Sequence, residues 1–185
     1  IAEKTANPHA APVLIVAFGD SVTQGMTELG CQSPDGVYHA RLKRMLENAY
    51  PMATFSVINA GQSGQTATGA LASLERDVLR HQPDLTLIGF GLNDAWGGTA
   101  GLGPFGAAIN SMIMRARTET RGDVIALTPS FMNKADNSRV APEHRQAELP
   151  GRVGGGDVLA ALFIPSPAEL ALDHRARHRL ACLQH

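Results

Sequence analysis

The chain has 185 residues, of which 44% are hydrophobic and 18% charged. This length is enough for one domain with a buried core. Its 17 acidic and 16 basic residues nearly cancel, and no apolar run approaches the roughly 20 residues that a membrane span requires. These features argue against nucleic-acid binding and against a membrane span, and they predict a single globular domain over residues 1–185.

The first segment, residues 1–11, is small, polar and marked by proline, and we expect a loose N-terminus. The chain starts at Ile1, as it would after removal of a signal peptide, so we expect it in the periplasm or outside the cell, with the cytoplasm as the alternative. Export would permit a disulfide between Cys31 and Cys182, the only cysteines; two unpaired thiols are the alternative.

Short, β-branched apolar runs bounded by Gly, Pro or Asp predict four buried strands, at residues 12–18, 55–60, 85–91 and 123–129. Between them, hydrophobic residues at helical spacing predict three helices that pack on the sheet: Tyr38, Leu42, Met45, Leu46 and Ala49; Leu71, Leu74 and Val78; and Phe105, Ile109, Met112, Ile113 and Ala116. Alternation of strands and helices predicts an α/β fold, in which helices cover both faces of a parallel sheet.

The C-terminal part, residues 134–185, differs in character from the rest. It is polar, rich in Arg and His, and marked by Pro and Gly, with no clear hydrophobic period. The run at 157–163 could add a last short strand. We expect this part to belong to the same domain, because no second set of core elements is present.

Three polar turns follow the first three predicted strands. Ser21 lies in "VAFGDSVTQG", Gly64 in "NAGQSGQTA" and Asn93 in "GFGLNDA". Because the carboxyl ends of parallel strands share one edge of a sheet, we expect these three residues to converge there.

That combination suits nucleophilic catalysis. A serine hydroxyl needs a base to take its proton and donors to hold the oxyanion. The backbone N–H groups of Ser21 and Gly64 and the amide of Asn93 would supply three such donors. Each also has an ordinary structural interpretation: Asp20 or Ser21 as a helix N-cap, Gly64 as a turn glycine, and Asn93 as part of an Asx turn. Their occurrence on three consecutive strand ends favours the catalytic interpretation.

The segments "FGDSVTQG", "NAGQSGQTATG" and "GFGLNDAWGG" resemble the first three sequence blocks of the SGNH hydrolases, also called the GDSL esterase/lipase family, over residues 12 to about 130. The resemblance implies a flavodoxin-like, three-layer α/β/α fold and hydrolysis of esters or thioesters. It implies Ser21 as the nucleophile, with Gly64 and Asn93 completing the oxyanion hole. Asp20 would belong to the framework of the first block.

The acid and base of that family, Asp-x-x-His, have no match here, and the nearest approach is "LALDHRARHRLA". If two residues were deleted, Asp173 would be the acid and His174 the base; if the loop were lengthened, His178 would be the base. The structural alternative is an exposed helix in which Asp173 pairs with Arg177.

We therefore predict a serine esterase that hydrolyses small acyl or aryl carboxylic esters or thioesters through an acyl-enzyme on Ser21. Within the family that it resembles, lysophospholipids and acetylated carbohydrates are further candidate substrates. Trp96 and Phe105, in the predicted long loop 94–106, would line an acyl or aryl pocket, although Phe105 also belongs to the predicted helical core stripe. No cofactor and no metal site is predicted: the glycine turns lack phosphate-loop and dinucleotide patterns, and the remaining histidines, His39 and His81 on helix surfaces among them, suit solvated or capping roles.

Two alternatives remain. The first is a non-catalytic protein of the same fold that binds esters or carbohydrates. The second is an unrelated flavodoxin-like binding protein in which Ser21 only caps a helix.

Overall fold

The structure is a computed structural model that describes residues 2–5, 7–27 and 30–129. Its four described strands form one parallel sheet in the order β2-β1-β3-β4. The strands are β1 (Val13–Gly19), β2 (Phe55–Gly61), β3 (Leu85–Gly89) and β4 (Asp123–Ala126). All four lie where the sequence predicts strands, although β3 and β4 end two and three residues earlier than expected. The predicted strand at 157–163 lies outside the described residues.

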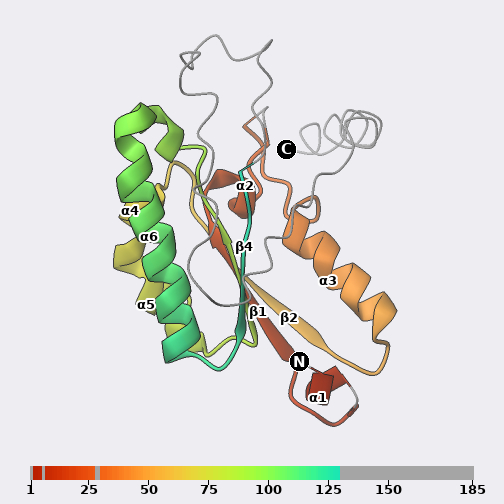
Figure 1. Ribbon diagram of the computed structural model, residues 1–185. Coiled ribbons are helices and arrows are strands. Elements are labelled where there is room, and N and C mark those ends of the chain that lie inside the picture. Colours follow the sequence, from red (N-terminus) through yellow and green to blue (C-terminus); the bar gives the residue numbers. More distant parts are fainter. Residues whose placement is uncertain (1, 6, 28–29, 130–185) are drawn as a thin grey trace.

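Helices cover both faces of this sheet (Figure 1). One face carries α3 (Tyr38–Ala49), and the other carries α4 (Ala67–Ala70), α5 (Leu74–Asp77) and α6 (Gly98–Glu119). Alternate residues of β1 serve the two cores: Val16 and Phe18 pack toward α6, and Ile15 and Ala17 pack toward α3. Burial on both faces explains the continuous apolar sequence of β1. The predicted three-layer α/β/α fold is confirmed.

The inward face of α3 is rotated relative to the prediction. Tyr38, Leu42 and Leu46 pack against the sheet, but Met45 is 58% exposed. His39, expected on the surface, is buried instead, with 4% of its surface exposed. A polar side chain can occupy this position because it has a backbone hydrogen-bond partner, described below.

The two helical stretches on the other face also differ in detail. The first is a broken run of α4, the 3-10 helix η1 (Leu71–Ser73), α5 and the 3-10 helix η2 (Leu79–His81). The second is longer than expected: the predicted loop 94–106 contains the 3-10 helix η3 (Asp94–Gly97) and the first two turns of α6, including Pro104. Packing of this helix outweighs the weak helix propensity of its glycine-rich start.

The N-terminal segment is more ordered than the loose chain expected. Residues Ala2–Thr5 form the short helix α1, and Lys4 Nζ lies 2.7 Å from Asp84 Oδ2. Lys4 also donates to the carbonyl oxygen of Pro12 over 3.3 Å, and Asp84 accepts a 2.8 Å hydrogen bond from the Leu14 N–H. The Asp84 carboxylate thus holds the N-terminal segment against the start of β1.

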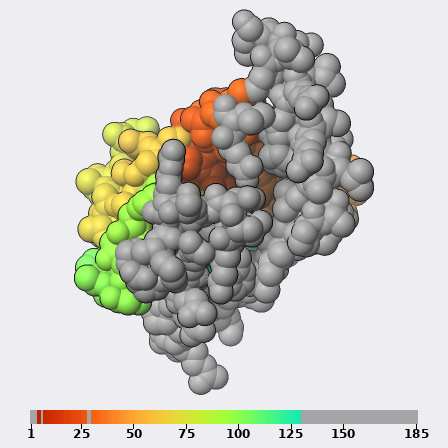
Figure 2. Space-filling view, turned by 90° about the horizontal axis from the view of Figure 1, so that it is seen from above, coloured from red at the N-terminus to blue at the C-terminus, as the bar shows by residue number. Residues whose placement is uncertain are grey.

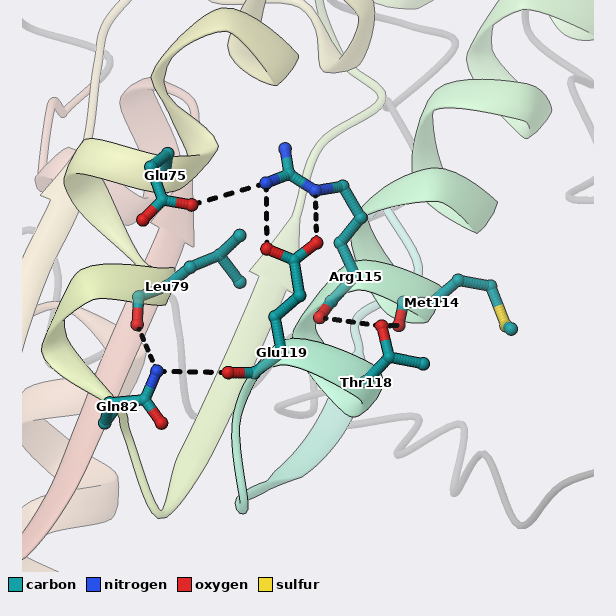
Figure 3. Close-up of polar contacts among 7 residues, drawn as sticks. All are labelled: Glu75, Leu79, Gln82, Met114, Arg115, Thr118 and Glu119. Carbon is teal, nitrogen blue, oxygen red and sulfur yellow. Dashed lines mark hydrogen bonds and ion pairs between the residues drawn. The ribbon is translucent and has the colours of Figure 1, made fainter.

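Polar contacts fasten the C-terminal end of α6 to α5 and η2 (Figure 3). Arg115 forms two hydrogen bonds with the carboxylate of Glu119, at 2.6 and 3.0 Å, and reaches Glu75 at 3.3 Å. Gln82 Nε2 donates to the carbonyl oxygens of Leu79 and Glu119, each over 3.0 Å. These contacts lie at the opposite end of α6 from η3, and they stabilise this helical layer.

Candidate active site

A row of glycines ends the three central strands. In the sheet register, Gly19 of β1 lies opposite Gly61 of β2 on one side and Gly89 of β3 on the other. A Cβ atom on Gly19 would lie 2.1 Å from Thr23 Oγ1 and 2.4 Å from the Gly89 carbonyl oxygen, and one on Gly61 would lie 2.2 Å from the Gln24 nitrogen. The missing side chains therefore allow the helix α2 (Ser21–Gln24) to rest directly on the sheet edge.

Ser21 is the first residue of α2, and the preceding Asp20 is its N-cap. Asp20 Oδ1 accepts a 3.0 Å hydrogen bond from the Val22 N–H, so the capping role falls to Asp20 and not to Ser21. The Ser21 side chain is partly exposed, and none of the described residues forms a hydrogen bond with its hydroxyl.

The Asp20 carboxylate is buried and caps α2. Only 2% of the residue is exposed, and burial raises the pKa of Asp20 above its ordinary value. The negative charge of Asp94 acts in the same direction, while the hydrogen bond from Val22 opposes it. A carboxylate that is buried and committed to a helix cap fits the framework role better than that of an acid in a proton relay.

Gly64 occupies the turn between β2 and α4. Its φ angle is +76°, a left-handed conformation that favours glycine, and a Cβ atom there would meet no atom within 4 Å. The Gln62 N–H donates to the Gly19 carbonyl oxygen over 2.9 Å, which ties the start of this turn to the end of β1. Gly64 is thus a turn glycine on an exposed loop beside α2.

Asn93 and Asp94 join the end of β3 to the same turn. The Asn93 Nδ2 donates to the Gln65 carbonyl oxygen over 2.9 Å, and both carboxylate oxygens of Asp94 accept from the Ala67 N–H, at 3.0 and 3.2 Å. An amide nitrogen carries two hydrogens, so Asn93 keeps a second N–H for another acceptor. Burial raises the pKa of Asp94, while hydrogen bonds from Ala67 and other backbone N–H groups lower it.

The structure therefore brings together the three loops that carry Ser21, Gly64 and Asn93. Their strands are neighbours in the sheet, with β1 between β2 and β3. Seen from above, the red-to-orange segment that contains α2 borders the golden-yellow segment that follows β2 (Figure 2). Sequence inspection missed the contributions of Gln24 and Asp94 to this contact, since each acts on a backbone N–H many residues away.

The predicted acid and base, Asp173, His174 and His178, lie outside the described residues, as does Cys182. Of the histidines that the structure describes, His39 contacts α2: its Nε2 lies 3.0 Å from the Thr23 carbonyl oxygen. Burial lowers the pKa of His39, so the ring is held neutral and donates to this carbonyl. His39 supports the helix that carries Ser21.

The two aromatic residues predicted to line an acyl pocket lie in different places. Phe105 is 7% exposed and belongs to the core between α6 and the sheet, as its place in the predicted helical stripe indicates. Trp96, in η3, is 58% exposed. Trp96 alone of the two is accessible to a ligand.

Other site classes find no support in the described ranges up to residue 129. No group of three or more His, Cys, Asp or Glu side chains there is arranged to hold a metal ion. No helix in that part of the chain is long and apolar enough to cross a membrane.

Comparison with known proteins agrees with this geometry. The chain is 26% identical over 157 residues to an acetylxylan esterase of Geobacillus stearothermophilus, and 32% identical over 113 residues to the esterase TesA of Pseudomonas aeruginosa. These alignments cover 75% and 60% of this chain and 68% and 52% of the relatives, so the chain spans only part of their length.

A solved structure gives the same result. The lipase/acylhydrolase from Enterococcus faecalis superposes with a TM-score of 0.58 at 28% identity, covering 72% of this chain and 66% of that one. Residues 17–153 match the GDSL-like lipase/acylhydrolase family, a range that includes the turns of Ser21, Gly64 and Asn93. This match, together with the shared fold, excludes an unrelated flavodoxin-like protein, and the chain belongs to the GDSL-like lipase/acylhydrolase family.

Proposed function

We propose that this chain is a serine esterase that acts through an acyl-enzyme on Ser21. The observation that carries the proposal is the common end of β1, β2 and β3 at the glycine row, from which the loops of Ser21, Gly64 and Asn93 start side by side. The 2.9 Å hydrogen bond from Asn93 to Gln65 locks two of these loops together. Donors fixed before the reaction need no reorganisation when the oxyanion forms.

In the proposed reaction, His174 or His178 takes the proton of the Ser21 hydroxyl, and Oγ attacks the ester carbonyl carbon. The carbonyl oxygen becomes an oxyanion, held by the N–H groups of Ser21 and Gly64 and the free N–H of Asn93. The histidine then protonates the leaving alcohol as the carbon–oxygen bond breaks. Water repeats the sequence on the acyl-enzyme and releases the acid and free Ser21. Asp173 would orient the imidazole.

We propose short acyl esters as substrates, including acetyl esters of carbohydrates, with aryl esters and thioesters as further substrates. The support is the family itself, the similarity to an acetylxylan esterase and to the esterase TesA, and one exposed aromatic side chain close in sequence to Asn93. Trp96 lies three residues after Asn93 in η3 and presents an apolar surface on which an aryl group or a sugar ring can stack.

A serine-directed fluorophosphonate tests the proposal directly. The full chain should gain one phosphonyl group on Ser21, located by peptide mass spectrometry, and should hydrolyse p-nitrophenyl acetate. Ser21→Ala should abolish both while its thermal unfolding stays close to that of the wild type. A folded wild-type chain that is neither labelled nor active would overturn the proposal and favour the non-catalytic binding protein.

The pH profile tests the base. Because the imidazole must be neutral to accept the proton, kcat/KM should fall as the pH drops below about 6.5, the ordinary pKa of histidine. His174→Ala and His178→Ala then identify the base, because only one of the two should lose activity. A rate independent of pH through this range would argue against a histidine base.

A further inference from the structure

The side chain of Gln24 holds the turn that contains Gly64. Gln24 Oε1 accepts a hydrogen bond of 2.8 Å from the Ser63 N–H and one of 2.5 Å from the Ser63 hydroxyl. Ser63 immediately precedes Gly64, so the two bonds fix the peptide unit next to the proposed Gly64 donor. One acceptor atom thus engages the backbone and the side chain of the same residue.

Gln24 is well placed to couple this turn to the nucleophile. It is the last residue of α2, three positions after Ser21, and lies on the same short helix. Its own backbone is fixed as well, because Asn59 Nδ2 donates to the Gln24 carbonyl oxygen over 3.1 Å and Asn59 Oδ1 accepts from the Gly61 N–H over 3.0 Å. The helix end, the end of β2 and the Gly64 turn therefore form one connected unit.

The Gly64 turn needs such an anchor. Gly64 is exposed, and a Cβ atom there would meet nothing within 4 Å, so packing does not hold it. On its far side the turn is held by the bonds from Asn93 and Asp94 to Gln65 and Ala67. On its near side, the side-chain anchor present among the described residues is Gln24. Without Gln24, the near side of the turn would keep, among the described residues, the backbone hydrogen bond from the Gln62 N–H to the Gly19 carbonyl oxygen.

We propose that Gln24 is a positioning residue that sets the place of the Gly64 N–H relative to Ser21. The proposal rests on the esterase function proposed above, since it assigns Gln24 to the oxyanion hole of that site. Gln24 takes no part in bond making. Its effect arises because an oxyanion donor contributes fully only at the correct distance from the developing charge.

The test compares Gln24→Met with Gln62→Met. Methionine has nearly the length of glutamine but lacks the amide acceptor, and Gln62 lies on the same exposed turn with no side-chain hydrogen bond among the described residues. With p-nitrophenyl acetate, Gln24→Met should lower kcat about tenfold with KM nearly unchanged, as displacement of one donor would. Gln62→Met should leave both constants at the wild-type values.

A second measurement does not depend on catalysis. In ¹⁵N relaxation, the backbone order parameter of Gly64 should fall from about 0.85 toward 0.6 in Gln24→Met, but not in Gln62→Met. Gln24→Glu, which keeps the acceptor oxygen, should restore the rigid value. Ser63→Ala removes the hydroxyl bond to Gln24 but keeps the backbone one, so it should lower kcat less than Gln24→Met does. Adding Gln24→Met to Ser63→Ala should lower kcat by a smaller factor than Gln24→Met does in the wild type, because the two residues share one contact.

The outcomes separate the two proposals. An active wild type whose kcat is unchanged by Gln24→Met, or whose loss appears only in KM, overturns the role of Gln24 and leaves the esterase intact. An inactive, unlabelled wild type overturns the esterase proposal and with it the catalytic role of Gln24. In either case, an unchanged Gly64 order parameter in Gln24→Met shows that Gln24 does not position the turn.

Discussion

The side-chain amide of Asn93 donates a 2.9 Å hydrogen bond to the carbonyl oxygen of Gln65, the residue that follows Gly64. This bond connects the loop after β3 to the loop after β2, and so connects the two proposed oxyanion donors outside α2. One N–H of the amide is used for the connection and one is left for the substrate. Asn93 therefore has a structural role in addition to its proposed catalytic one.

Asn93→Ala should remove both the hydrogen bond to Gln65 and the proposed oxyanion donor. We expect kcat to fall about 10²- to 10³-fold, the usual effect of removing one oxyanion donor. Fluorophosphonate labelling of Ser21 should also slow, because the phosphoryl oxygen uses the same donors. Steady-state kinetics and labelling rates check this. Retention of the wild-type kcat would contradict the assignment of Asn93 to the oxyanion hole.

Gly64→Ala and Gly30→Ala form a matched pair. Both glycines have a φ angle of +76° and open space where a Cβ atom would lie. Each substitution should therefore cost about 1–2 kcal/mol of unfolding free energy through backbone strain. Alanine keeps the backbone N–H, but strain at position 64 would displace this proposed oxyanion donor, so only Gly64→Ala should also lower kcat. Urea unfolding and esterase kinetics measure the two effects, and equal activities in the two variants would count against Gly64.

Gly19→Ala should disrupt the packing of α2 against the end of the sheet. Its Cβ atom would lie 2.1 Å from Thr23 Oγ1 and 2.4 Å from the Gly89 carbonyl oxygen, and backbone must move to relieve the clash. We expect a loss of about 3 kcal/mol, the upper part of the range for overpacking. Gly103→Ala, in α6 with no atom within 4 Å of the new Cβ, should instead stabilise by about 0.5–1 kcal/mol. Urea unfolding of both variants measures these free energies, and a Gly19→Ala variant as stable as the wild type would contradict the prediction.

Asp20→Asn should change how stability depends on pH. The pKa of Asp20 is raised in the folded chain, so between the ordinary value of 3.8 and the raised value the folded state binds more protons than the unfolded state. Asp20 therefore makes stability fall as the pH rises through that window. The asparagine variant keeps an oxygen for the Val22 N–H but lacks this titration. Relative to the wild type, its unfolding free energy should increase from pH 3.5 to 7; a constant difference would contradict the direction of the shift.

Trp96→Ala tests the proposed substrate contact. Trp96 is 58% exposed and makes no core contribution, so stability should change by no more than about 0.5 kcal/mol. If the indole stacks on the substrate, KM for an aryl ester should rise several-fold while kcat stays near the wild-type value. Met114→Ala, at a residue 50% exposed on α6, provides a control of similar exposure. Identical KM values in the two variants would show that Trp96 does not contact the substrate.

Local patterns in the sequence were sufficient for much of this protein. The apolar runs bounded by Gly, Pro or Asp predicted all four described strands, because burial on both faces demands continuous hydrophobic sequence. Their alternation with helical patterns predicted that the sheet is parallel. The same reasoning placed Ser21, Gly64 and Asn93 on one edge, since parallel strands present their carboxyl ends together.

Other features could not be predicted from sequence patterns and are visible only in the tertiary structure. His39 is buried because the Thr23 carbonyl oxygen lies within 3.0 Å of it, a contact that helical periodicity cannot reveal. The start of α6 is helical despite its glycines because the rest of the helix packs on the sheet and stabilises the whole element. Gln24 and Asp94 anchor the Gly64 turn across 39 and 27 positions of sequence. Periodicity reports which face of an element is buried, whereas contacts between loops depend on strand register and order, and these arise only when the whole sheet assembles.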